Sequence, residues 1–83
     1  MRKKHRITLD RIFEDPVRSD ILWSDVESLL ESLGGELLEG RGSRIRVYLK
    51  DVRAVFHRPH PRKETDRGTV RSVRRFLMVA GVR

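Results

Sequence analysis

Apolar residues along this chain follow a helical spacing at both ends and a strict alternation in between. In the first stretch, His5, Leu9, Ile12 and Phe13 fall on one side of a helix. This helix has to end before Pro16, because proline disfavours helical geometry in the residue that precedes it. We therefore expect a short N-terminal helix.

A second helix is predicted to start at Ser24. Ser24 and Glu27 have the spacing of a capping box, in which the serine hydroxyl and the glutamate side chain satisfy exposed backbone N–H groups. The apolar stripe that follows repeats at i, i+3, i+4 and i+7 and consists of Val26, Leu29, Leu30 and Leu33. Gly34-Gly35 then offers the left-handed stop that ends many helices.

Alternating apolar and polar residues predict an antiparallel sheet between residues 36 and 57. A first strand over 36–39 is followed by a turn at Arg41-Gly42 and a second strand over 43–49. In the second strand, the apolar face consists of Ile45, Val47 and Leu49, and the polar face of Arg44, Arg46 and Tyr48.

Lys50-Asp51 is predicted to be a two-residue turn into a third strand over 52–57. Residues that face each other across this turn then have numbers that sum to 101. The core-side pairs are all apolar: Leu49 with Val52, Val47 with Ala54, and Ile45 with Phe56. The other face pairs Tyr48 with Arg53, Arg46 with Val55, and Arg44 with His57. The sheet should have one core face and one basic, solvated face.

The last helix is predicted to begin near Gly68-Thr69, with Thr69 as its cap, and to end at Gly81. Its inward-facing residues are Val70, Val73, Leu77 and Ala80. Three arginines lie off this apolar stripe and are expected to extend the positive surface: Arg71, Arg74 and Arg75.

The charge balance favours a polyanionic partner. The 83 residues leave room for one domain, and 19 Lys plus Arg against 12 Asp plus Glu give a formal net charge of +7. The arginines concentrate after residue 40 and the acids before it, as expected of a surface that binds nucleic acid. The chain has no cysteine, which excludes disulfides and thiolate chemistry, and it has no apolar run that could span a membrane. We expect a cytoplasmic protein.

Two segments carry a resemblance to a known family. The first is Gly40-Arg41-Gly42-Ser43. The second runs from the basic Pro/His loop at 58–63 through Lys63-Glu64 and Gly68-Thr69 to Ala80-Gly81. In this order the segments resemble the HicA-family toxins, small ribonucleases of bacterial toxin–antitoxin pairs, and the resemblance spans residues 24–82.

The resemblance implies an α+β fold like that of double-stranded-RNA-binding domains, in the order α-β-β-β-α, with both helices on one face of a three-stranded antiparallel sheet. It assigns residues 23–83 to this domain and leaves 1–22 as a helical extension. It also implies mRNA as substrate, metal-independent cleavage without a cofactor, and neutralisation by an acidic HicB-like antitoxin.

The sequence departs from the family at one decisive position. The family usually has its catalytic histidine directly after the Gly-Ser turn, whereas this chain has Arg44. A guanidinium remains charged at any working pH and cannot act as an ordinary general base, although it can clamp a phosphate. Either catalysis has moved to another histidine, or the domain binds RNA without cleaving it.

Metal-free RNA cleavage needs a base for the ribose 2′-OH, an acid for the leaving oxygen and cations near the phosphate, and histidine suits both proton transfers. His57, predicted to lie across from Arg44, is the first candidate, and His60, which matches the family's Pro-x-His-like turn, is the second. His5 lies in the extension and is not expected to take part. The candidate RNA contacts are Arg44, Arg46, Tyr48, Arg53, Arg58, Arg62 and Lys63.

Other functional classes fit the sequence less well. The carboxylates of Asp10, Glu14 and Asp15 are interpreted as a solvated helix face, so no metal site is expected. A non-catalytic module of the same fold, binding structured RNA or an acidic protein, stays open. A DNA-binding regulator is disfavoured, because no helix-turn-helix pair with the usual tight turn is visible.

Overall fold

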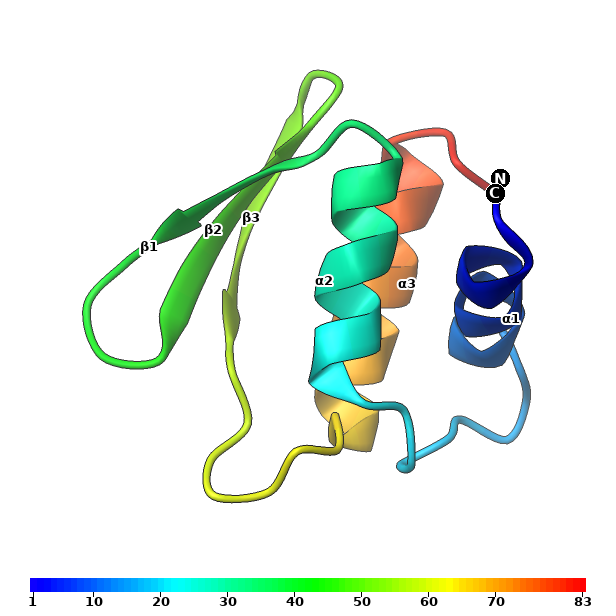
Figure 1. The fold of residues 1–83 in the computed structure, drawn as a ribbon, viewed down its shortest axis with the longest axis horizontal. Coiled ribbons are helices and arrows are strands. Elements are labelled where there is room, and N and C mark those ends of the chain that lie inside the picture. Colours follow the sequence, from blue (N-terminus) through cyan, green and yellow to red (C-terminus); the bar gives the residue numbers. More distant parts are fainter.

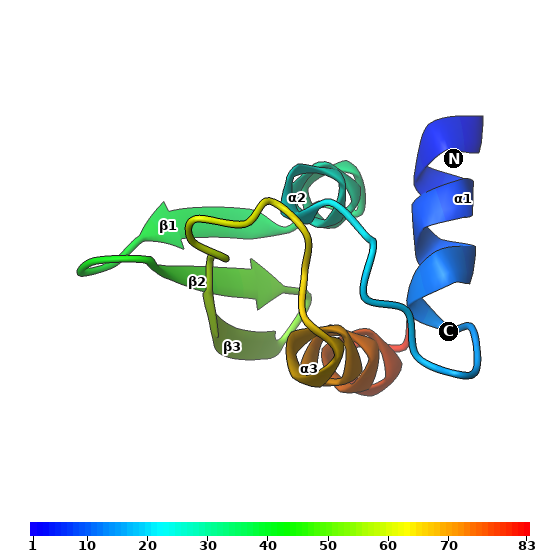
Figure 2. The same cartoon turned by 90° about the horizontal axis from the view of Figure 1, so that it is seen from below.

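The computed structural model describes all 83 residues as three helices and one three-stranded antiparallel sheet (Figure 1). The elements are α1 (Lys3–Ile12), α2 (Trp23–Ser32), β1 (Glu36–Glu39), β2 (Arg44–Leu49), β3 (Val52–His57) and α3 (Arg67–Val79). Helices α2 and α3 cover one face of the sheet, and α1 crosses behind them on the side away from the sheet (Figure 2). The predicted α+β fold, with an N-terminal helix added to α-β-β-β-α, is confirmed.

The sheet has the strand order β1-β2-β3 and the predicted register. All six pairs expected between β2 and β3 are present, from Arg44 with His57 to Leu49 with Val52. The turn places Lys50 at φ 56°, the left-handed geometry that two-residue hairpin turns use. The alternation is confirmed too, since Ile45, Val47 and Leu49 are buried while Arg44 and Arg46 are exposed.

Helices on both sides of the core and the sheet all contribute buried side chains to it. Three aromatic rings connect its layers: Trp23 lies 6.0 Å from Phe56, and Phe56 lies 5.7 Å from Phe76 in an edge-to-face arrangement, measured between ring centroids. Leu9 and Ile12 of α1 are buried in the same cluster. Because these side chains share the core of the sheet and its covering helices, α1 is an integral layer of the fold.

Two glycines end helices as predicted. Gly34 after α2 and Gly81 after α3 have φ of 94° and 77°, a region that side chains rarely adopt. In each case the next residue's N–H reaches back, from Gly35 to the carbonyl of Leu30 at 2.8 Å and from Val82 to that of Leu77 at 2.9 Å. These bonds satisfy carbonyls that the helix leaves free.

The predicted capping box at Ser24 is wrong. Helix α2 begins at Trp23, and no side chain caps it. Its start is instead fixed by residues that are remote in the sequence. The backbone N–H of Trp23 donates to the carbonyl of Lys63 at 3.0 Å, and Leu22 forms a β-bridge with Glu64. Glu27, the expected second member of the box, has other partners.

Two expectations about α3 are also wrong. The cap is Asp66, whose carboxylate accepts bonds from the backbone N–H and the hydroxyl of Thr69. Arg74 does not extend the open positive surface, because its guanidinium donates to the carbonyls of Ile12 and Glu14 and pairs with Asp15 at 3.2 Å. It ties α3 to the end of α1.

The longest helix has 13 residues, and no helix is both long and apolar enough to cross a membrane.

Candidate functional site

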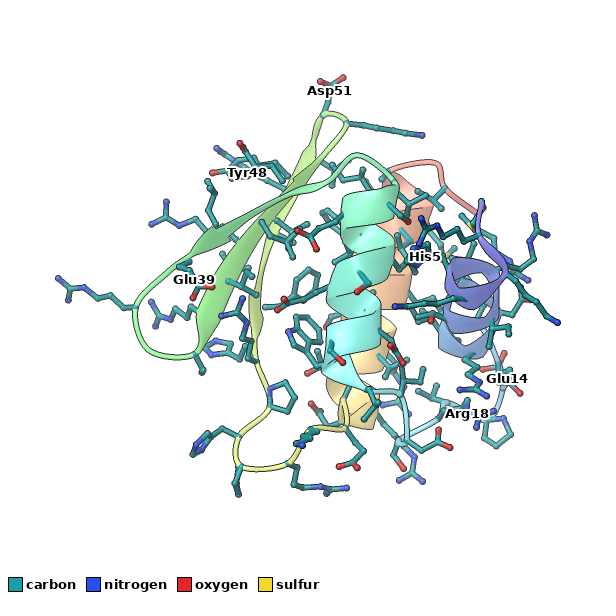
Figure 3. The ribbon with its side chains drawn as sticks, viewed as in Figure 1. His5, Glu14, Arg18, Glu39, Tyr48 and Asp51 are labelled. Carbon is teal, nitrogen blue, oxygen red and sulfur yellow. The ribbon has the colours of Figure 1, made fainter.

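The face of the sheet that the helices leave uncovered is basic. Alternation along β2 and β3 puts Arg44, Arg46, Arg53 and His57 on it as exposed side chains. Tyr48, half-buried, lies on the same side, away from the helices (Figure 3). None of these three arginines forms an ion pair. We call this surface the open face.

His57 and Arg44 are direct neighbours on the open face. The next pair along the two strands, Ser43 with Arg58, is a hydrogen-bonded pair, since the N–H of Arg58 donates to the carbonyl of Ser43 at 2.8 Å. Arg44 and His57 therefore form a non-hydrogen-bonded pair, the type in which opposed Cα atoms come to about 4.5 Å and the side chains are closest. The sequence predicted that Arg44 and His57 are paired. The structure adds that this pair is of the non-hydrogen-bonded type, in which the side chains are closest.

A hollow surrounds this pair, lined by Gly40, Arg41, Arg44, Arg46, Val55 and His57. Gly40 faces Arg44 across the β1–β2 turn, and its N–H donates to the carbonyl of Arg44 at 2.9 Å. A Cβ at Gly40 would come within 3.2 Å of the Cβ of Arg44, so the glycine leaves room for that side chain. The result is one imidazole beside three guanidinium groups, all open to solvent. We call it the His57 hollow.

His60 does not join His57. It lines a neighbouring hollow with Gly42, Ser43, Arg58 and Pro59, and the two hollows share no residue. The two candidate proton carriers thus line different hollows, although Ser43 and Arg58 of the second are the chain neighbours of Arg44 and His57 in the first. Any proton transfer in the His57 hollow relies on a single imidazole.

The remaining candidate contacts are spread around this centre. Tyr48 and Arg53 face each other further along the strands, roughly 13 Å from Arg44 at the usual rise per residue. Arg62 and Lys63 line a third hollow at the start of α2, beside Trp23. Arg62 has only a long ion pair, 3.9 Å to Glu64. His5 lies between α1 and the other two helices, far from all of these (Figure 3).

Arg58 differs from the other candidate cations, because its guanidinium is already occupied. Its Nε lies 2.7 Å from Glu27, and its Nη1 lies 2.7 Å from Glu39. Glu27 also accepts a bond from the indole N–H of Trp23. The carboxylates of Glu27 and, to a smaller extent, Glu39 raise the pKa of Arg58. This network joins α2, β1 and the segment after β3, and thereby fixes the end of the strand that carries His57.

Sequence reasoning missed two features of the site. The sequence predicts only a turn position for Arg41, although the turn brings it into the His57 hollow. Its proximity could have been inferred, because it lies three residues before Arg44 in a tight turn. The Arg58 network was missed as well. Successive residues of a strand point to opposite faces, so a His57 on the open face predicts that Arg58 points to the opposite side, toward the helices.

A three-stranded antiparallel sheet with two helices on one face and a bare basic face defines a small α+β domain of the double-stranded-RNA-binding-domain-like class. A family model described as HicA toxin of bacterial toxin–antitoxin matches residues 23–82. The chain belongs to this family, and it is therefore a toxin of a toxin–antitoxin system with a cognate antitoxin as partner. Neither the curated proteins nor the solved structures contain a match.

Proposed function

We propose that this toxin binds mRNA on the open face and cleaves it without a metal ion, with His57 as the proton carrier. The observation that carries the proposal is the close pair of His57 and Arg44 in the His57 hollow. In this proposal Arg44 stands where the resemblance places the family's usual histidine, and His57 of the neighbouring strand provides the imidazole instead. Cytoplasmic mRNA is the substrate class that this activity addresses.

The chemistry follows from the groups in the hollow. The imidazole of His57 accepts the proton of a ribose 2′-OH, the 2′ oxygen bonds to the adjacent phosphorus, and the bond from phosphorus to the 5′ oxygen breaks. The proton held by His57 passes to that leaving oxygen. Arg41, Arg44 and Arg46 stabilise the negative charge that builds on the phosphate. Positioned proton transfer of this kind contributes about 10²- to 10⁴-fold in rate.

A second candidate function has its own supporting observation. The His57 hollow holds several permanent cations beside its single imidazole, and these cations can bind phosphate without any proton transfer. A toxin without cleavage would act by holding RNA. The two functions predict the same affinity for RNA and differ only in whether the RNA is cut.

A cleavage assay in chelator separates the two functions. Purified toxin is incubated with a defined single-stranded RNA, beside His57→Ala and His60→Ala variants, and fragments are read on a denaturing gel. We expect cleavage by the wild type and by His60→Ala, and a loss of about 10²-fold or more for His57→Ala. Intact RNA that still shifts on a native gel would instead support the non-catalytic function.

We propose further that the cognate antitoxin is an acidic, HicB-like protein that covers the open face. Unpaired arginines on this face attract a carboxylate-rich surface as well as they attract phosphates, so antitoxin and RNA should exclude each other. The test is competition: the antitoxin should displace labelled RNA from the toxin. Simultaneous binding of both would contradict a shared surface.

A further inference from the structure

In residues 1–22 the carboxylates are all paired, whereas most of the cations are not. The four side-chain carboxylates of residues 1–22 all have arginine partners: Asp10 pairs with Arg83 at 2.6 Å, Asp15 with Arg74 at 3.2 Å, and Glu14 and Asp20 with Arg18 at 2.8 and 2.7 Å. The other cations of this segment form no ion pair, and they are Arg2, Lys3, Lys4, Arg6 and Arg11. The start of α1 therefore carries a net positive charge that nothing in the fold neutralises.

A hollow connects this end of α1 to the sheet. Arg6 and Lys50 both line it, together with the C-terminal residues Gly81, Val82 and Arg83. Its one side-chain carboxylate, that of Asp10, is held by Arg83. Lys50 belongs to the turn that joins β2 and β3, the strands that carry the arginines of the open face (Figure 1). Unpaired cations thus lie on both sides of this turn, on the open face and at the start of α1, and the turn itself carries Lys50 beside the exposed carboxylate of Asp51.

We propose that Arg2, Lys3, Arg6 and Lys50 form a second phosphate-binding surface, which extends the path of a bound RNA from the open face across the β2–β3 turn. We call it the α1 surface. It lies largely outside the residues matched by the family model, so it is a property of this chain's extension. The choice of RNA as ligand rests on the proposed function, whereas the surface itself rests on the unpaired charges.

A lipid membrane is the weaker candidate for this basic helix. A helix that lies on a membrane inserts an apolar face among the lipid chains. In α1 that face is occupied, because Leu9 and Ile12 are buried against the rest of the protein and Thr8 is buried as well. Ile7 is the large apolar side chain of α1 that is exposed, and it is 40% exposed. The free groups are charged, so the attraction is to phosphates.

The test compares two double variants that remove the same charge from different places. Arg6→Gln with Lys50→Gln removes two cations of the hollow. Arg71→Gln with Arg75→Gln removes two cations from α3, which lies on the other side of the sheet from the open face, so these two arginines do not extend that surface (Figure 2). All four side chains are exposed and form no side-chain hydrogen bond or ion pair. Binding is measured against salt concentration with single-stranded RNAs of about 4 and about 24 nucleotides, the shorter matching the smallest site, about 4 nucleotides, known for an OB-fold domain.

We expect the hollow variant to bind the longer RNA about 5- to 20-fold more weakly at low salt. The slope of log affinity against log salt should fall by about 1.4, since each lost contact to a single strand accounts for about 0.7. Its affinity for the short RNA should change less than 3-fold, and the α3 variant should bind both RNAs nearly as the wild type does. Equal losses in both double variants would reduce the effect to net charge and overturn the α1 surface.

Two further measurements separate this proposal from the one it rests on. If Arg44→Gln with Arg46→Gln abolishes RNA binding and the hollow variant binds normally, the α1 surface is refuted and the open face stands. If neither variant changes RNA binding, both proposals fail. Vesicles of phosphatidylserine and phosphatidylcholine give the remaining arm: sedimentation that depends on Arg6 and Lys50, with unchanged RNA affinity, would assign the surface to lipid instead.

Discussion

The arginines of the open face and three arginines of the helical side have the same chemistry and different surroundings. On the helical side, Arg18, Arg74 and Arg83 all have carboxylate partners, and the last two also lie over the ring of Phe13 at 5.7 and 5.1 Å from its centroid. On the open face, Arg44, Arg46 and Arg53 have none. The partners, and not the residue type, distinguish a cation that holds the fold from one left for a ligand.

The largest difference in stability between the two sides should come from removing a buried apolar side chain. Ile12 of α1 is fully buried, so Ile12→Ala should lower the free energy of unfolding by about 2–4 kcal/mol. Val55, on the open face and 55% exposed, is the control, and Val55→Ala should change it by less than about 0.5 kcal/mol. Urea titrations give both values. Similar small losses would mean that α1 is dispensable to the core.

The next effect concerns the charge network of Arg58. Arg58→Met should lower the free energy of unfolding by about 1–3 kcal/mol, because Glu27 stays largely buried, 21% exposed, without its cation. Arg53→Met removes an equal charge from the open face and should cost less than about 0.5 kcal/mol. If the two variants are equally stable in urea, the distinction between structural and free arginines is wrong at this position.

The cap of α3 should have a smaller, pH-dependent effect. Asp66→Ala should cost about 1 kcal/mol at neutral pH, the usual value of a helix cap. Hydrogen bonds from Thr69 lower the pKa of Asp66 below its ordinary value of 3.8. The fold thus favours the ionised carboxylate, so its contribution is complete above pH 3.8 and is lost as the pH falls through the lower, folded pKa. The Tm difference between wild type and variant should shrink in that acid range. A gap that stays constant would point to a loss unrelated to the charge.

The smallest effect on stability is expected from the repulsion between like-charged arginines on the open face. Arg44 and Arg46 are two residues apart on one strand and point to the same side. Replacing Arg46 by Gln should leave the free energy of unfolding unchanged or raise it by up to about 0.5 kcal/mol, because like charges on one face destabilise a sheet. Thermal unfolding at low salt is the measurement, and high salt should remove any gain. A clear loss of stability would show that this arginine serves the fold.

The sequence predicted the sheet better than it predicted the helix starts. The short turn at Lys50 fixed the register of both strands, and with it the position of His57 opposite Arg44, because each residue's place follows from its neighbours. The start of α2 depends instead on Lys63 and Glu64, some forty residues away. The same holds for Arg58, whose partner Glu27 is 31 residues distant. Long-range contacts of this kind leave no local spacing to recognise.

The most direct test asks whether the imidazole has moved across the strand pair. Four proteins are compared for RNA cleavage in chelator: the wild type, His57→Ala, Arg44→His, and the variant that carries both changes. If the His57 hollow is the active site, His57→Ala should lose about 10²-fold or more in rate, and adding Arg44→His should restore much of it by returning an imidazole to the same hollow. Undiminished cleavage by His57→Ala would contradict the account.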